Sequence, residues 1–173
     1  MQKNKSVHNL FITGLGLGYA PFAPGSVASL GGMALWLMVY ALLLLLDLRY
    51  ALAVFVYGGP WILLIIAWPY VQTALDQIEE RDPSFIVIDE WVGLGIALTP
   101  LASYLDDGGL SISQICLAIL IPFGLFRLFD IWKPGPIKTL EKMPGAAGVM
   151  MDDVLAGIFA WLVGSPILKA LLA

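Results

Sequence analysis

The chain is 173 residues long, enough for one domain, and 60% of its residues are hydrophobic while only 13% are charged. Soluble domains are nearer half apolar and a quarter charged, so this composition, with a mean hydropathy of +0.87, excludes an ordinary soluble protein and indicates a membrane protein. The net charge of −4 argues against nucleic-acid binding, which needs a basic surface.

Three uncharged stretches are long enough to cross a bilayer as helices, since a crossing takes about 20 residues. They are residues 27–46, 51–75 and 108–126. Within the second stretch, Gly58-Gly59-Pro60 and Pro69 predict a kink.

Two further uncharged stretches, residues 91–105 and 154–168, have 15 residues each. As helices they would be about 22 Å long, which is short of a hydrocarbon core of about 30 Å. To cross the bilayer, each must draw the acidic pair that precedes it to the membrane boundary. These pairs are Asp89 with Glu90 and Asp152 with Asp153.

The residues before Asp89 allow two structures. Asp82-Pro83 is a good helix start, with Asp as the cap and Pro at the first position, and would place Asp89 about two turns inside a helix. A short strand over residues 84–88 (SFIVI) is the competing interpretation.

The distribution of Lys and Arg predicts the orientation, because cytoplasmic loops carry an excess of both. With five spans and a cytoplasmic N-terminus, seven of these residues are cytoplasmic: Lys3, Lys5, Arg81, Arg127, Lys133, Lys138 and Lys142. Only Arg49 and Lys169 then lie outside, where Asp106-Asp107 is expected to form a turn. The sequence therefore predicts an all-α, polytopic membrane protein with about five transmembrane or membrane-embedded helices in a single domain over residues 1–173.

This topology also brings acidic residues from three separate spans to one membrane face. The starts of the third and fifth spans and the end of the fourth meet there. They carry Asp89, Glu90, Asp130, Asp152 and Asp153.

A segment rich in Gly and Pro, residues 14–30 (GLGLGYAPFAPGSVASL), leads into the first span. Glycine lets the backbone approach a ligand closely, a following helix offers N–H groups to an anion, and Ser26 and Ser29 could add hydroxyls. The alternative is a hinge or tight helix packing, which is common in membrane proteins. No βαβ unit surrounds the segment, so it is not a dinucleotide-binding fingerprint.

Residues 86–93 (IVIDEWVG) place the adjacent carboxylates of Asp89 and Glu90 at membrane depth. Such charges are costly there unless they are paired or bound to a cation. The alternative is a helix end whose carboxylates reach water.

Residues 126–138 (FRLFDIWKPGPIK) place Arg127 and Asp130 three apart, on one helix face. They could form a local ion pair with Arg127 extended toward water. Alternatively, Asp130 binds a metal and Arg127 binds phosphate, whose oxygens suit a planar guanidinium. Lys133 lies in a basic loop that would attract anionic headgroups, although the ordinary excess of cytoplasmic Lys and Arg also explains it.

Residues 145–157 (GAAGVMMDDVLAG) place Asp152 and Asp153 at the expected start of a helix after glycines. Acidic residues suit a helix N-terminus, which would explain one of the two. Five unpaired carboxylates on one face would repel each other, so a divalent cation is expected among them. Ligands that are all oxygen favour Mg²⁺ or a similar hard ion.

The four motifs, in this order and in a chain of this length, resemble the phosphatidylglycerophosphatase A family of bacteria over about residues 14–157. The resemblance implies Mg²⁺-dependent hydrolysis of phosphatidylglycerophosphate to phosphatidylglycerol and inorganic phosphate, in phospholipid biosynthesis at the bacterial inner membrane. It also implies that the functional set, catalytic and metal-binding, is Asp89, Glu90, Asp130, Asp152 and Asp153. The candidate phosphate-binding residues are Arg127, Lys133, Ser26 and Ser29.

The chemistry of the remaining residues agrees with a metal-dependent phosphatase. The single cysteine, Cys116, has no Arg a few residues beyond it, and the single histidine, His8, is far from the carboxylates in the sequence. A cysteine or histidine nucleophile is therefore not expected. Mg²⁺ can offset the charge of a phosphomonoester and activate water or a carboxylate.

Two other classes of protein use carboxylates near a membrane. A CDP-alcohol-type phosphotransferase also binds magnesium through Asp residues, but it would need a denser Asp array that begins with Asp-Gly and is followed by Ala-Arg. A cation transporter would place its carboxylates nearer the bilayer midplane. Clustering at one face favours the phosphatase.

Overall fold

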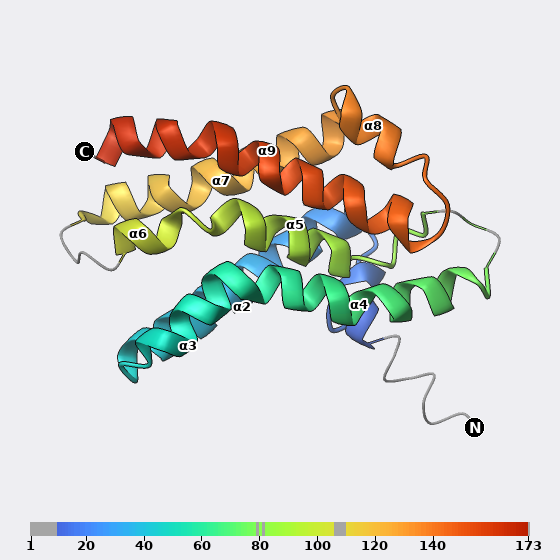
Figure 1. Ribbon diagram of the computed structural model, residues 1–173, viewed down its shortest axis with the longest axis horizontal. Coiled ribbons are helices and arrows are strands. Elements are labelled where there is room, and N and C mark those ends of the chain that lie inside the picture. Colours follow the sequence, from blue (N-terminus) through green and yellow to red (C-terminus); the bar gives the residue numbers. More distant parts are fainter. Residues whose placement is uncertain (1–9, 79, 81, 106–109, 173) are drawn as a thin grey trace.

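A computed structural model describes residues 10–78, 80, 82–105 and 110–172 of the chain (Figure 1). Within these residues the structure is all-helical, without strands. The helices are η1 (Leu17–Tyr19), α2 (Pro24–Leu45), α3 (Arg49–Ala53), the π-helical η2 (Val54–Gly58), α4 (Gly59–Leu75), α5 (Ile88–Leu98), α6 (Leu101–Leu105), α7 (Ile112–Trp132), α8 (Pro136–Leu140) and α9 (Ala146–Leu172).

Five passes run alternately between two ends of an elongated bundle: α2, α3–α4, α5–α6, α7 and α9 (Figure 1). Four helical stretches are long and apolar enough to cross a membrane. They are Pro24–Leu45, Arg49–Leu75, Ile112–Trp132 and Ala146–Leu172. Many of their large apolar side chains, including Ile65, Leu120 and Ile131, are exposed, as lipid-facing residues must be. The expected polytopic helical fold is confirmed.

The two uncharged stretches of 15 residues fold differently from each other. Residues 154–168 belong to the 27-residue helix α9, which is long enough by itself. Residues 91–105 instead form parts of two short helices, α5 and α6, broken at Thr99 and Pro100. The proline explains the break, because it lacks the N–H that would continue the α-helical hydrogen bonds.

Both predictions for the residues before Asp89 are wrong. α5 begins at Ile88, so Asp89 and Glu90 lie in its first turn, and no strand forms over residues 84–88. Val87 instead donates its N–H to the carbonyl oxygen of Ile12 at 2.9 Å. This long-range contact satisfies the Val87 N–H, which would have bonded within the helix if the helix had begun earlier.

Helix α9 also begins earlier than expected, so Asp152 and Asp153 do not open it. It starts at Ala146, and no acidic residue lies in its first turn. Gln72 of α4 accepts the N–H of Ala146 at 2.9 Å and so caps this end. Asp152 and Asp153 lie in the second turn, and stabilisation by the helix dipole therefore does not account for either of them.

The short helix α5 is the centre of the bundle. All its residues except Trp91 are buried, and its most extensive packing is against α9. Glycine makes this packing possible: a Cβ on Gly93 would collide with the backbone of Asp153, and one on Gly157 with the backbone of Gly93. The close approach holds the first turn of α5 beside the second turn of α9.

The glycine-rich segment packs against the entry to α5. A Cβ on Gly18 would collide with the carbonyl of Phe85, one on Gly25 with the Glu90 carboxylate, and one on Gly32 with the Trp91 indole. The Trp91 indole N–H also donates to the carbonyl oxygen of Ala28 at 2.8 Å. The glycines therefore allow tight packing, which was one of the two interpretations of this segment.

The connections before α2, between α4 and α5, and between α7 and α9 meet at one end of the bundle (Figure 1). The predicted clustering of acidic residues from separate passes depends on this arrangement. Lys3, Lys5, His8 and Arg81 of the sequence predictions lie outside the described residues, as does the expected turn at Asp106-Asp107.

Candidate functional site

A polar cavity of about 180 Å³ opens where these connections meet. Its lining includes all five carboxylates that the sequence predicted, together with Lys133. The lining residues are Pro24, Gly25, Asp82, Ser84, Ile86, Asp89, Glu90, Asp130, Lys133, Asp152 and Asp153. Six carboxylates and one ammonium group therefore share one small space.

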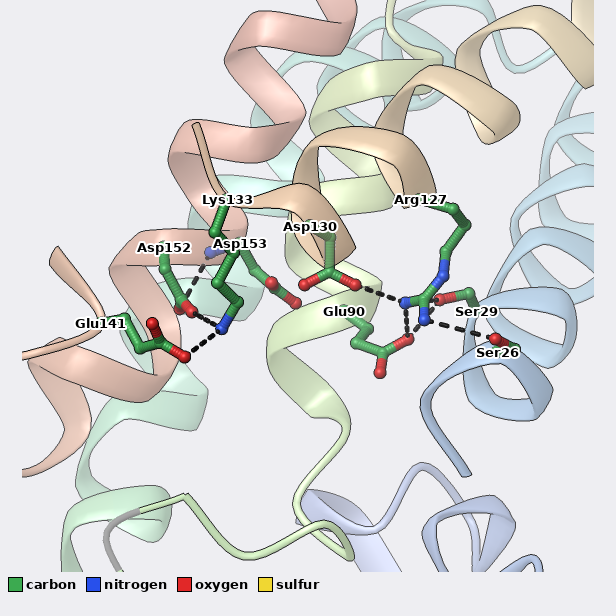
Figure 2. Close-up of polar contacts among 9 residues, drawn as sticks. All are labelled: Ser26, Ser29, Glu90, Arg127, Asp130, Lys133, Glu141, Asp152 and Asp153. Carbon is green, nitrogen blue, oxygen red and sulfur yellow. Dashed lines mark hydrogen bonds and ion pairs between the residues drawn. The ribbon is translucent and has the colours of Figure 1, made fainter. Parts of the chain in front are cut away.

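Arg127 of α7 holds two of these carboxylates (Figure 2). Its Nη1 lies 2.8 Å from Glu90 Oε2 and 2.7 Å from Asp130 Oδ2. The same guanidinium donates to the hydroxyls of Ser29 and Ser26 at 3.2 and 3.3 Å, and the Ser29 hydroxyl in turn donates to Glu90. The predicted Arg127–Asp130 pair is thus one part of a network that joins α2, α5 and α7.

Lys133 holds a third carboxylate (Figure 2). It ends α7 in a left-handed conformation with φ 47°, and its Nζ lies 2.7 Å from Asp152 Oδ2 and 2.9 Å from Glu141 Oε1. Burial by itself lowers the pKa of this ammonium, but the bonds to Asp152 and Glu141 outweigh burial and raise the pKa above its ordinary value. Lys133 is therefore charged at neutral pH.

Asp89 and Asp153 have no cation beside them within the described part of the chain. Both are buried, at 7% and 3% exposed, and Asp89 Oδ1 and Asp153 Oδ2 have no hydrogen-bond partner. Their helices approach each other at Gly93 and Gly157, and both side chains line the cavity. Buried carboxylate oxygens without partners are costly, and a bound cation would offset that cost.

These residues fit a magnesium ion rather than a metal enclosed by protein ligands. Among the described residues, no three Asp, Glu, His or Cys side chains form a complete metal site. Mg²⁺ is usually bound by one or two carboxylates, keeping several waters and taking substrate phosphate oxygens. Asp89 and Asp153, which line the polar cavity and each carry an oxygen without a partner, supply that number of protein ligands.

Asp82 is a lining residue that the sequence predictions assigned to a helix cap and not to the functional set. It lies in the connection between α4 and α5, outside the long helices, and faces the same cavity as the five predicted carboxylates. Partial desolvation in the cavity wall raises the pKa of this otherwise exposed carboxyl group, while nearby Lys133 partly opposes the shift. In the sequence, only its position in a connection at the same membrane face as the five carboxylates could have indicated that it lines the cavity.

The predicted phosphate-binding residues separate into two groups. Lys133 lines the cavity, whereas Arg127, Ser26 and Ser29 do not, since they lie beside Glu90 in the network described above. Cys116 is exposed near the start of α7, at the other end of the bundle. That Arg127, Lys133, Ser26 or Ser29 binds phosphate stays a prediction.

The fold and the cavity define a polytopic helical membrane protein with a carboxylate-lined site at one end of its bundle. The model of the phosphatidylglycerophosphatase A family matches residues 10–167. The chain belongs to this family and is a phosphatase, as its resemblance in sequence motifs implied.

Three curated relatives cover most of the chain. A phosphatidylglycerophosphatase A of Haemophilus influenzae is 35% identical, over 90% of this chain and 85% of its own length. Its namesake from Escherichia coli is 31% identical over 88% and 78%. A protein of Bacteroides thetaiotaomicron named as a putative phosphatidylinositol-3-phosphatase is 35% identical over 87% of each chain. No solved structure matches this chain significantly.

Proposed function

We propose that this protein hydrolyses phosphatidylglycerophosphate to phosphatidylglycerol and inorganic phosphate in phospholipid biosynthesis, and that it depends on Mg²⁺. The observation that carries the proposal is a cavity lined by Lys133 and by two buried carboxylates, Asp89 and Asp153, each of which has an oxygen without a partner. The names of two relatives and the family support the choice of substrate.

In this proposal Asp89 and Asp153 hold the magnesium ion, and Lys133 binds a phosphate oxygen. Bound Mg²⁺ supplies positive charge that offsets the phosphate dianion and makes water more acidic. Arg127 holds Glu90 and Asp130 in place, as Lys133 holds Asp152 in the absence of substrate. Glu90, Asp130 and Asp152 remain candidate ligands from the sequence, although each already has a cationic partner.

A phosphate-release assay with purified protein in mixed micelles tests the activity. We expect phosphate release from phosphatidylglycerophosphate with Mg²⁺, background release after chelation with EDTA, and recovery when Mg²⁺ is restored. Undiminished release in EDTA would contradict the magnesium dependence. Hydrolysis of phosphatidic acid at an equal rate would contradict selectivity for the headgroup.

The same preparation separates the competing functions. Phosphatidylinositol-3-phosphate belongs in the substrate panel, because the Bacteroides relative carries that substrate in its name. A CDP-alcohol-type phosphotransferase would release CMP from a CDP-linked lipid, and a cation transporter in liposomes would carry ions without releasing phosphate. Either result without phosphatase activity would replace the proposal.

We further propose that the protein resides in the bacterial inner membrane with the cavity on the cytoplasmic side. Lys133, Lys138 and Lys142 lie at the cavity end, whereas Asp47 lies at the other end. In a Cys116→Ser background, a cysteine introduced by Lys138→Cys is expected to react with a membrane-impermeant reagent only from the cytoplasm. One introduced by Asp47→Cys is expected to react only from outside, and the reverse pattern would invert the orientation.

A further inference from the structure

Asp82 and Ser84 lie on the exposed side of the cavity, in the connection between α4 and α5. Both residues are exposed, whereas Asp89 and Asp153 at the base of the cavity are buried. Neither Asp82 nor Ser84 has a hydrogen bond or ion pair with the described residues, so their polar groups are available to a ligand. Because all four residues line one cavity, a headgroup whose terminal phosphate reaches Asp89 and Asp153 can contact Asp82 and Ser84.

Asp82 is an unexpected residue for the entrance of a site that binds phosphate. Its carboxylate repels a phosphate dianion, and Lys133 is the only cation among the lining residues that the structure describes. The repulsion is offset when the ligand presents a hydrogen-bond donor to Asp82. A carboxylate accepts strongly from a hydroxyl, and Ser84 can donate to or accept from the same group.

The two lipid phosphates considered above share such a donor. In phosphatidylglycerophosphate, the carbon next to the one that bears the terminal phosphate carries a free hydroxyl. In phosphatidylinositol-3-phosphate, both neighbouring ring carbons do. In phosphatidic acid, the neighbouring carbon carries an acyl ester and offers no donor.

We infer that Asp82, assisted by Ser84, selects lipid phosphomonoesters that carry a free hydroxyl on the carbon adjacent to the phosphorylated carbon. The inference rests on the proposed function and specifies its substrate class. Repulsion disfavours every phosphomonoester, and the hydrogen bond restores binding only for those that have the hydroxyl. Selectivity therefore comes from the hydrogen bond, since the repulsion is common to all these lipids.

A synthetic analogue isolates the hydroxyl. Phosphatidyl-1,3-propanediol phosphate has the charge and length of phosphatidylglycerophosphate but lacks the hydroxyl. Wild-type protein is expected to prefer the natural lipid in kcat/KM by roughly 10- to 100-fold, as a hydrogen bond to a charged group allows. Asp82→Ala is expected to bring this ratio close to one, and Asp82→Asn, which keeps one acceptor oxygen, to an intermediate value. Ser84→Ala is expected to lower the ratio by less.

Glu80→Ala is the matched control, because Glu80 is an exposed carboxylate of the same connection that does not line the cavity. It should retain the wild-type ratio. A wild-type ratio near one, or an unchanged ratio in both Asp82 variants, would overturn the inference while leaving the proposed function intact. Wild-type protein that releases phosphate from none of these lipids would overturn the proposed function, and the inference with it.

Discussion

Replacing Asp89 or Asp153 by Asn is expected to lower phosphatase turnover by at least about 10²–10³, by analogy with the loss of one electrostatic contact at an active site. Both side chains are buried, line the cavity and carry an oxygen without a hydrogen-bond partner. Asn keeps the shape but removes the charge that would attract Mg²⁺. The measurement is phosphate release from phosphatidylglycerophosphate across a Mg²⁺ titration.

The same variants are expected to remain folded and inserted in the membrane. Removing one of two unpaired buried charges relieves repulsion, so thermal stability without magnesium should be unchanged or higher. This combination of lost turnover and retained stability distinguishes a metal ligand from a structural residue.

We expect Asp130→Asn to lose comparable turnover, because Asp130 lines the same cavity.

Asp47→Asn is the control for these variants. Asp47 is exposed at the opposite end and pairs with Arg49 at 2.9 Å on the surface, where an ion pair contributes little. Its activity and stability should stay close to those of the wild type. Near-normal Mg²⁺-dependent turnover in Asp89→Asn, Asp130→Asn and Asp153→Asn together would contradict a shared site.

Replacing Arg127 by Leu is expected to destabilise the fold by about 3–5 kcal/mol, because it leaves Glu90 and Asp130 as buried charges without their partner. The three side chains are only 12–15% exposed, so water offers little compensation. The free energy of unfolding in mixed detergent micelles measures this loss. Arg127→Lys should be intermediate, since a point charge cannot reproduce the fork that reaches Ser26, Glu90 and Asp130 together.

A double variant tests whether charge is the cause. Arg127→Leu combined with Glu90→Gln removes one stranded carboxylate, and it should recover part of the lost stability without recovering activity. Ser29→Ala, which keeps every charge, should cost less than Arg127→Leu. Wild-type stability in Arg127→Leu would show that the network of Arg127 does not hold α2, α5 and α7 together.

The sequence by itself determined the helical membrane fold and the identity of five acidic lining residues. Runs of apolar residues fix where helices can cross a bilayer, because no other open structure satisfies the backbone there. Alternation of the passes then brings Asp89, Asp130 and Asp153 to one end, however the helices pack. The pair Arg127–Asp130 also follows from sequence, since residues three apart share a helix face.

Only the tertiary structure decided which of these carboxylates are paired with a cation and which are not. The contacts of Arg127 with Glu90 and Ser29, and of Lys133 with Asp152, join residues 37, 98 and 19 positions apart. Such pairings depend on how closely α5 approaches its neighbours, which small residues such as Gly25, Gly93 and Gly157 permit. No local spacing encodes that approach, and none could single out Asp89 and Asp153 as the unpaired carboxylates. The sequence also did not reveal the role of Asp82, because a connection has no periodicity that could place its side chain in the cavity.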